Sequence, residues 1–376
     1  MVYLELKLET KNDNSYLTHS YHPYPCKFIP QVPRFLISKF TVEGDWVFDP
    51  FVGSGTSLVE ASLLGRNGIG IDLNPVAVLS TKVKTTALSD SGVEQVKSVI
   101  EKVSLVNWEY DKLVKERFDP DLVPKFKNLN HWFEPDAIIE LAALKKLVFE
   151  VEDDARDFLL LAFSNIIVSV SNQESETRYV AVNKKFRKGD AFYLFYKKVS
   201  EMLLRDLEYK KIRSKSITKV YWSDYRDMSK IDDGSIKLII TSPPYINTFD
   251  YYLYHKLRIL WLGFDPSKVR ALEMGCHHTT KDFDSAYAKY KDDLNILFSG
   301  SYEKLGKDGV FSIIIGDGIV RNKRLDSIDL IRETARRYNF SLFDIISQDL
   351  KDTTRSFNVR FSGEGKKEYI ISLRKG

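Results

Sequence analysis

Short apolar runs separated by turn residues mark the first part of the chain. Runs at 46–48 and 68–71 predict two strands, because each is short, rich in apolar residues and bounded by Gly, Asp or Asn. Apolar residues at helical spacing occupy 57–64 between these strands and reappear after the second one. Residues 46–84 therefore predict a βαβα unit of a parallel sheet.

The pattern becomes helical from about residue 89 to residue 210. Four segments space their apolar residues three and four positions apart, at 92–106, 135–150, 154–169 and 191–209. Ser91 and the pair Glu134-Pro135 are suitable helix starts, since Pro fits the first turn of a helix. This stretch predicts a helical block.

Strand-like segments then return in the last part of the chain. They are expected at 218–222, 236–240, 310–315, 341–346 and 369–373, with one helix at 327–338. The last two strands have no helical segment between them and are expected to pair antiparallel. The pattern therefore predicts one α/β sheet built from both ends of the chain, with the helical block inserted.

Composition excludes several classes of protein. The chain has 376 residues, of which 43% are hydrophobic and 29% charged, as is usual for a globular protein with a large core. No apolar run is long enough to cross a bilayer, and the N-terminal residues lack a signal-peptide pattern. Cys26 and Cys276 are too few for a disulfide framework and lack metal-ligand spacing. We expect a cytoplasmic protein with no metal and no membrane partner.

Positive charge is concentrated in one segment. The net charge is +4, yet residues 184–219 contain twelve Lys or Arg and four Asp or Glu, so this segment alone carries +8. Such a cluster is typical of a solvated helical face or of a surface that contacts a polyanion such as nucleic acid. The charge pattern alone leaves both interpretations open.

A glycine-rich turn follows the first strand, in the sequence DPFVGSGT from Asp49 to Thr56. Gly53 and Gly55 allow a tight turn and close approach of a ligand to the backbone. The second strand ends at Asp72, a position from which a carboxylate can accept hydrogen bonds from ribose hydroxyls. The turn lacks the lysine of a phosphate-binding GxxxxGK[ST] loop and the third glycine of GxGxxG. These residues predict a nucleoside site, with Asp49 placed to bind an ammonium group.

Three further motifs give these residues a family resemblance. DPFVGSGT and the downstream GIDLNP resemble motifs I and II of the amino-group DNA methyltransferases, and TSPPY at 241–245 resembles their catalytic motif IV. HPYPCKFIP at 22–30 is similar to the family segment that closes over the methionine end of the cofactor. The resemblance implies an α/β fold: a Rossmann-like class I methyltransferase sheet, mostly parallel with an antiparallel last strand. It also implies S-adenosyl-L-methionine as the cofactor.

The resemblance assigns residues to cofactor binding. The expected cofactor-binding residues are Lys27, Phe28, Asp49, Pro50, Phe51, Gly53, Gly55, Thr56, Asp72, Leu73, Asp224 and Thr241. Asp224 ends the strand before that of TSPPY and is implied to contact the adenine amino group. A helix cap or turn is the alternative role for Asp224.

Ser242, Pro243, Pro244 and Tyr245 are the expected catalytic residues. An exocyclic amine is a poor nucleophile because its lone pair is delocalised into the ring. Acceptors against its two hydrogens favour the geometry of attack, and the Ser242 oxygen and the Pro243 carbonyl are suitable. The two prolines hold that carbonyl in place, and Tyr245 offers a ring on which a flipped base can stack.

The expected reaction is site-specific methylation of the N4 amine of cytosine in duplex DNA. A serine at position 242 resembles the cytosine-N4 enzymes, whereas an aspartate is commoner among adenine-N6 enzymes. Adenine-N6 methylation of DNA and methylation of an RNA amine remain alternatives, as does a catalytically silent nucleic-acid-binding protein. The recognition sequence, and the presence of a restriction endonuclease acting on the same site, cannot be read from these residues.

The motif order predicts three regions. Residues 1–88 form the cofactor-binding half, residues 89–216 a helical insert that reads the DNA target, and residues 217–376 the catalytic half. The expected DNA-binding residues are Lys184, Lys185, Arg187, Lys188, Lys211, Arg213 and Arg355. The polar segment 171–178 is expected to be a loop that either lies near the flipped base or is simply flexible.

Overall fold

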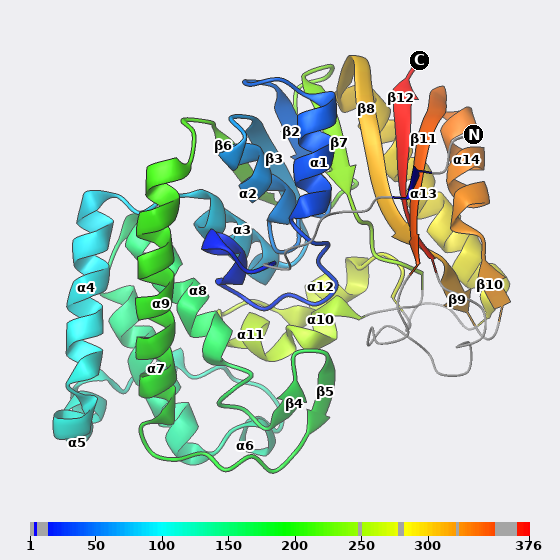
Figure 1. The fold of residues 1–376 in the computed structure, drawn as a ribbon. Helices are drawn as coiled ribbons and strands as arrows, with labels where there is room; N and C mark the ends of the chain where they lie inside the picture. Colours follow the sequence, from blue (N-terminus) through cyan, green and yellow to red (C-terminus); the bar gives the residue numbers. More distant parts are fainter. Residues whose placement is uncertain (1–3, 6–13, 247–249, 277–281, 321–322, 350–366) are drawn as a thin grey trace.

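One eight-stranded sheet forms the centre of the molecule (Figure 1). The computed structural model describes residues 4–5, 14–246, 250–276, 282–320, 323–349 and 367–376. The strands follow the order β1-β11-β12-β8-β7-β2-β3-β6. Their bounds are β1 Leu4–Glu5, β2 Trp46–Asp49, β3 Asn67–Asp72, β6 Thr218–Trp222, β7 Ile236–Thr241, β8 Leu305–Gly316, β11 Phe340–Asp349 and β12 Lys367–Lys375.

Strand direction confirms the fold that the resemblance implies. Strands β6, β3, β2, β7 and β8 pair in parallel, and β12 runs antiparallel to both of its neighbours, β8 and β11. All seven strands expected from the sequence are present, and the antiparallel pairing of the last two is confirmed. Because β2, β3, β6 and β7 are parallel, their carboxyl ends lie along one edge of the sheet.

Helices cover both faces of the sheet. Val47 and Phe48 are both fully buried, although successive strand residues point to opposite faces. Val47 packs with α1 (Gln31–Phe40) and α2 (Thr56–Leu63), whereas Phe48 packs with α13 (Phe283–Lys304) and α14 (Ser327–Arg337). Burial on both faces explains why these strands read as continuous apolar runs instead of alternating.

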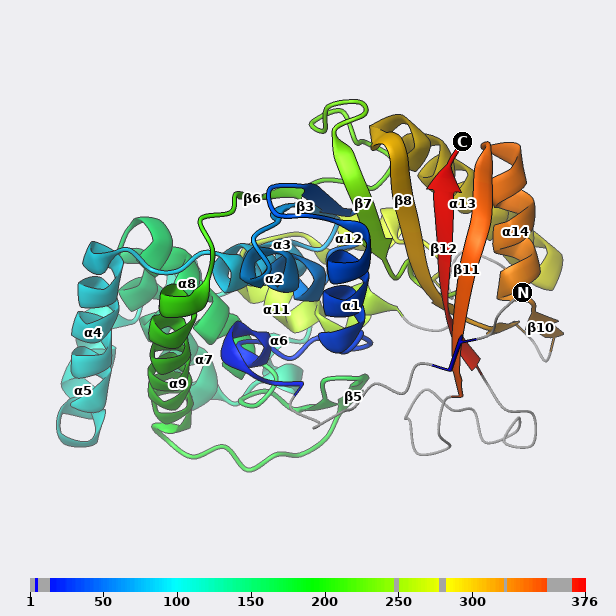
Figure 2. The same ribbon diagram turned by 45° about the horizontal axis from the view of Figure 1, so that its top comes forward.

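A helical block lies beside the β6 edge of the sheet (Figures 1 and 2). Its elements, with α3 leading into it, are α3 Pro75–Thr85, α4 Asp90–Ser104, α5 Val106–Arg117, α6 Leu129–Trp132, α7 Pro135–Phe149, α8 Asp153–Ile166, α9 Asp190–Ile212 and the 3₁₀ turn η2 Pro120–Leu122. The core of the block also contains Tyr21, Leu257 and Trp261, which lie outside 89–216 in the sequence. The division of the chain at residues 88 and 216 therefore stays a prediction.

Local side chains fix several of the helix starts. Pro135 opens α7, as expected, and Pro75 opens α3 after the cap Asn74, whose side chain accepts a hydrogen bond from the Val76 N–H. Helix α4 begins at Asp90, with Ser89 as its cap, so the expected start at Ser91 was one residue late.

Several elements were not expected from the sequence. They include η1 Leu17–Ser20, α1, the hairpin strands β4 Gln173–Ser175 and β5 Arg178–Ala181, α11 Lys256–Trp261, α12 Pro266–Leu272, α13, β9 Gly318–Val320 and β10 Lys323–Leu325. Tyr251 and Tyr252 lie on a further short helix, α10 (Tyr251–Tyr254). Within the described part of the chain, none of the helices combines the length and apolar character that a bilayer crossing demands.

The β4–β5 hairpin replaces the expected loop at 171–178 and is held by a buried cation. Arg258 on α11 is fully buried, and its guanidinium donates two hydrogen bonds to the carboxylate of Glu176, at 2.7 and 2.8 Å. Its Nε also donates to the Ser164 carbonyl on α8, at 2.9 Å. One side chain thus joins the hairpin, the helical block and the helix that follows TSPPY.

Removing the Glu176 carboxylate should destabilise the protein, because it leaves the buried Arg258 guanidinium without its counter-ion. We expect Glu176→Ala to lower the free energy of unfolding by about 2 kcal/mol; the Glu176 side chain is 34% exposed, which reduces the cost of a fully buried pair. Denaturant-induced unfolding measures this change.

Glu174 on the same hairpin provides the control. It pairs with Arg178, whose side chain is 65% exposed, so Glu174→Ala should cost less than about 1 kcal/mol. Equal losses in the two variants would contradict the anchoring role of Arg258.

Candidate cofactor and target-amine site

A pocket opens at the carboxyl ends of β2, β3, β6 and β7, with about 830 Å³ of empty space that includes open solvent at its mouth. Its walls come from the turn after β2, the tips of β3 and β6, the segment before α1, and α12 with the residues after it. Of the residues expected from the sequence, the pocket is lined by Lys27, Phe28, Pro50, Phe51, Gly53, Thr56, Asp72, Leu73, Asp224, Ser242 and Pro244. The glycine turn and the TSPPY segment therefore border one cavity.

Five expected residues support the pocket from behind its lining: Asp49, Gly55, Thr241, Pro243 and Tyr245. Gly55 has φ of +81°, and a Cβ there would lie 2.8 Å from Thr81 Oγ1 and 3.0 Å from Thr81 Cα. Any other residue would both strain the backbone and collide with α3. Gly55 thus allows the turn to pack closely under the pocket.

Asp49 ties the two motifs together. Its carboxylate is buried and accepts hydrogen bonds from Thr241 Oγ1 at 2.9 Å, Ser57 Oγ at 2.6 Å and the Phe51 N–H at 3.1 Å. Burial raises the pKa of Asp49 to about 6. With three donors from the protein and no place in the pocket lining, Asp49 is arranged to position the β2 turn against TSPPY, instead of binding an ammonium group directly.

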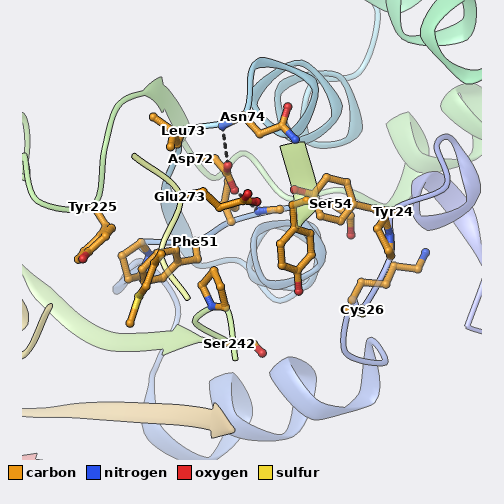
Figure 3. A pocket seen from close by; sticks show the side chains of 18 of the residues that line it. Tyr24, Cys26, Phe51, Ser54, Asp72, Leu73, Asn74, Tyr225, Ser242 and Glu273 are labelled. Atoms are coloured by element: carbon orange, nitrogen blue, oxygen red, sulfur yellow. Dashed lines mark hydrogen bonds between the residues drawn. The ribbon is translucent and has the colours of Figure 1, made fainter. Parts of the chain in front are cut away.

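Asp72 lines the pocket at the tip of β3. Its Oδ2 accepts from the Gly53 N–H at 2.9 Å and its Oδ1 from the Asn74 N–H at 2.8 Å, so the carboxylate joins the glycine turn to the start of α3 (Figure 3). Burial raises the pKa of Asp72 to about 6. The lining of the same pocket also contains apolar and aromatic side chains from Phe51, Leu73 and Tyr225.

Asp224 is held by its neighbours, although it lines the pocket. It accepts hydrogen bonds from the Arg226 N–H at 2.9 Å and from the Arg226 guanidinium at 2.7 Å. These hydrogen bonds give Asp224 the turn role that was the alternative in the sequence. Asp224 lines the pocket as well.

The TSPPY segment leaves β7 in an extended course against Gly275. A Cβ on Gly275 would lie 3.1 Å from the Tyr245 carbonyl oxygen and 3.2 Å from that of Pro244. Ser242 faces the pocket, Pro243 is buried, and the Tyr245 hydroxyl donates to Glu368 Oε1 at 2.9 Å. The Gly275 contact brings residues 273 and 274, which also line the pocket, next to TSPPY.

Glu273 is a site residue that the sequence did not reveal. It is 7% exposed, lines the pocket and extends toward Asp72 (Figure 3). Its Oε1 accepts from the Tyr252 N–H at 3.1 Å, while its buried Oε2 has no hydrogen-bond partner among the described residues. Burial raises the pKa of Glu273 to about 8. A buried acceptor with no donor is a binding position for a cation or a hydroxyl group.

Three aromatic or thiol side chains were also missed. Tyr24 and Cys26 belong to the segment quoted for the resemblance, and Tyr251 lies on α10; all three line the pocket. The Tyr24 ring stacks on His255 with centroids 4.8 Å apart. The HPYP sequence was the signal that could have identified Tyr24.

The basic residues expected to bind DNA fall into two separate groups. Lys184, Lys185, Arg187 and Lys188 precede the N-terminus of α9, and Lys211 and Arg213 lie at its C-terminus. With 23 residues, α9 places its two ends about 34 Å apart. Lys211 and Arg213 precede β6 and so lie toward the amino ends of the parallel strands, away from the pocket. Arg355 lies outside the described residues.

Contacts within the first group also differ. Lys184 is half-buried and its Nζ donates to the Val168 carbonyl at 3.0 Å, whereas Lys188 pairs with Asp111 at 3.0 Å. Lys185 and Arg187 are exposed. These two side chains are the ones best placed to meet a phosphate.

Comparison with known proteins shows what the chain is similar to. Residues 4–82 match the model of a family described as DNA methylase, N6_N4_Mtase. The chain is 27% identical to type II methyltransferase M.MvaI of Kocuria varians over 326 residues, 79% of this chain and 68% of that protein. It is 23% identical to M.BsoBI of Geobacillus stearothermophilus (74% and 59%) and 24% identical to M.MjaII of Methanocaldococcus jannaschii (84% and 74%).

Solved structures were compared as well. A TehB-like SAM-dependent methyltransferase from Corynebacterium glutamicum matches with a TM-score of 0.33 and 10% identity, over 91% of this chain and 86% of that one. A geranyl diphosphate C-methyltransferase from Streptomyces coelicolor A3(2) matches with a TM-score of 0.37 and 9% identity, over 92% and 80%.

Glu273 should make cofactor binding pH-dependent. Its pKa in the free protein is about 8, and a bound cation favours the ionised carboxylate. Affinity for S-adenosyl-L-methionine should therefore rise with pH up to about 8 through this group. Glu273→Gln should remove that contribution and weaken binding about 10-fold at pH 8. Calorimetric titration across this pH range tests both effects.

S-adenosyl-L-homocysteine is the matched ligand for this experiment, since it lacks the sulfonium charge. Its affinity should fall less in Glu273→Gln than that of S-adenosyl-L-methionine. If the affinities of the wild type and of Glu273→Gln had the same pH dependence for both ligands, Glu273 would not face the cofactor.

Proposed function

We propose that this chain methylates the N4 amine of cytosine in duplex DNA, because residues 4–82 match the amino-group DNA methylase family and most of the chain is similar to type II methyltransferases. The observation that carries the proposal is the shared cavity of the glycine turn and Ser242, held together by the Asp49–Thr241 hydrogen bond. A methyl donor bound to the turn and an amine held by Ser242 would meet in that cavity.

The lining of the pocket fits S-adenosyl-L-methionine. When bound, this cofactor supplies an electrophilic methyl group on a positively charged sulfur. Asp72 is placed to hold ribose hydroxyls, and the partnerless Oε2 of Glu273 adds an acceptor for a hydroxyl or a positive charge. Phe51 and Tyr225, with ring centroids 4.8 Å apart, provide apolar surface for an adenine ring.

TSPPY supplies the contacts to the target amine. The Ser242 hydroxyl and the Pro243 carbonyl accept hydrogen bonds from the two amine hydrogens and draw positive charge from the nitrogen as it attacks. Both prolines restrict the backbone, so these acceptors are in place before the base arrives. The Tyr245 ring stacks on the base once it leaves the duplex.

Serine at position 242 favours cytosine-N4 over adenine-N6 methylation in this proposal. The alternative, adenine-N6 methylation, uses the same cavity and the same two acceptors, and the family includes both activities in its description. The identity of the methylated base therefore decides between two reactions of one site.

DNA is proposed to enter beside the pocket, between the helical block and the carboxyl ends of the strands. Residues 89–216 carry the β4–β5 hairpin, and exposed Lys185 and Arg187 add positive charge to this block. The relatives are type II methyltransferases by name, which supports a cytoplasmic enzyme that protects a site from an accompanying restriction endonuclease.

Analysis of methylated nucleosides tests the reaction. The protein is incubated with labelled S-adenosyl-L-methionine and either mixed-sequence duplex DNA or RNA, and the products are digested and separated. We expect N4-methylcytosine from DNA and no label in RNA. N6-methyladenine would establish the alternative base, and label confined to RNA would refute the proposal.

Tyr245→Ala should separate cofactor binding from transfer. Loss of the ring removes the stacking surface for the extruded base, which is worth about 1–3 kcal/mol, so transfer should slow at least about 10-fold. Affinity for the cofactor should stay within about 2-fold, because Tyr245 does not line the pocket. Single-turnover rates and calorimetry measure the two quantities; a variant that methylates at the normal rate would contradict the stacking role.

A further inference from the structure

Two tyrosines from distant parts of the chain meet at one wall of the pocket. Tyr24 belongs to the segment before α1 and Tyr251 opens α10, and both line the pocket. Their ring centroids lie 6.4 Å apart, and the ring planes differ by 23°. A Cβ on Gly53 would lie 3.3 Å from Tyr24 Cε1, so the Tyr24 ring lies against the glycine turn. The two rings form an aromatic wall beside this turn.

The residue behind the aromatic wall adds no positive charge to it. His255 is fully buried, and its ring stacks on that of Tyr24. Neither ring nitrogen of His255 has a hydrogen-bond partner among the described residues. Burial, and then the nearby Arg258 cation, lower the pKa of His255 well below its usual value. Burial also raises the pKa of Tyr24 and of Tyr251 well above the usual value. All three rings are therefore neutral at physiological pH.

The aromatic wall lies at the end of the pocket opposite the proposed adenine surface. Figure 3 shows Tyr225 and Phe51 at one end of the pocket and Tyr24 at the other, with Asp72 between them. In S-adenosyl-L-methionine, the sulfur is attached to the ribose on the side away from the base. A cofactor with its adenine at Phe51 and its ribose at Asp72 thus extends its sulfur toward the aromatic wall.

We propose that Tyr24 and Tyr251 bind the sulfonium of S-adenosyl-L-methionine through the π systems of their rings. The face of an aromatic ring carries partial negative charge and attracts a cation within about 6 Å of the ring centroid. This attraction is strongest where water is excluded. The inference rests on S-adenosyl-L-methionine as the cofactor and does not depend on which base is methylated.

The aromatic wall distinguishes the cofactor from its product. Loss of the methyl group leaves S-adenosyl-L-homocysteine, whose sulfur is neutral, so the attraction to the rings disappears while the apolar contact remains. The wall therefore favours binding of the charged cofactor and release of the spent one. Glu273 also attracts a cation, but its contribution changes with pH as the carboxyl group ionises, whereas that of two neutral phenols does not.

Calorimetric titration of the two ligands into the wild type, Tyr24→Leu and Tyr251→Leu tests the inference. Each leucine variant should bind S-adenosyl-L-methionine about 10-fold more weakly, whereas its affinity for S-adenosyl-L-homocysteine should stay within about 2-fold of the wild type. The same loss is expected at about pH 6 and at about pH 9, which separates the rings from Glu273. Tyr24→Phe keeps the ring and should bind both ligands as the wild type does.

Tyr193→Leu is the matched control. Tyr193 is 62% exposed on α9 and does not line the pocket, so its variant should bind both ligands with wild-type affinity. Equal weakening of both ligands in Tyr24→Leu and Tyr251→Leu would overturn the inference, because a ring that only shapes the pocket affects the charged and the neutral ligand alike.

A series that preserves shape covers the case of a leucine variant that does not fold. Tyr24→Phe with one or three fluorines on the ring keeps the size of the side chain and weakens its attraction for a cation. The affinity for S-adenosyl-L-methionine relative to S-adenosyl-L-homocysteine should fall with each added fluorine. A ratio independent of fluorination would overturn the inference and leave the proposed function intact. A wild type that binds neither ligand would refute the cofactor, and the proposed function with it.

Discussion

The hydrogen bond from Thr241 to Asp49 is the contact on which the site depends. It joins the carboxyl ends of β2 and β7, two neighbouring parallel strands whose sequences are almost 200 residues apart. Ser57 and the Phe51 N–H share the same carboxylate, so the start of α2 and the turn before it are fixed to TSPPY as well. One buried acid thereby sets the position of the glycine turn relative to Ser242, and burial of that acid is tolerated because three donors surround it.

The features that the sequence predicted and those that it did not predict have different physical origins. Strands such as β7 were predicted because burial on both faces leaves an uninterrupted apolar run, and the turn residues were predicted because glycine and proline carry strong backbone preferences. Helix α13 was missed because Asp293 and Ser301 occupy buried positions of its apolar face and weaken the pattern. Its amphipathic character depends on tertiary partners, among them the Tyr225 hydroxyl that donates to Asp293.

Glu273 and Glu368 show a second limit of sequence reasoning. Each is a single acid with ordinary neighbours in the chain, and each becomes informative only when the fold places it beside the pocket or beside Tyr245. Asp49 is the opposite case, because the sequence identified the residue itself. Its expected role as an ammonium ligand could not take into account the three protein donors that its carboxylate meets in the fold. The structure was also needed to locate Lys211 and Arg213. The charge pattern of a sequence does not indicate which end of a long helix lies near the pocket.

The two prolines of TSPPY bear on how reaction rate responds to temperature. A flexible loop would have to lose conformational freedom each time it gripped a base, and that loss would appear as an unfavourable activation entropy. Pro243 and Pro244 lost that freedom when the chain folded, and the close approach of Gly275 to the Pro244 and Tyr245 carbonyls keeps the segment in place. In the proposed reaction, ordering of this segment should therefore contribute little to the activation entropy.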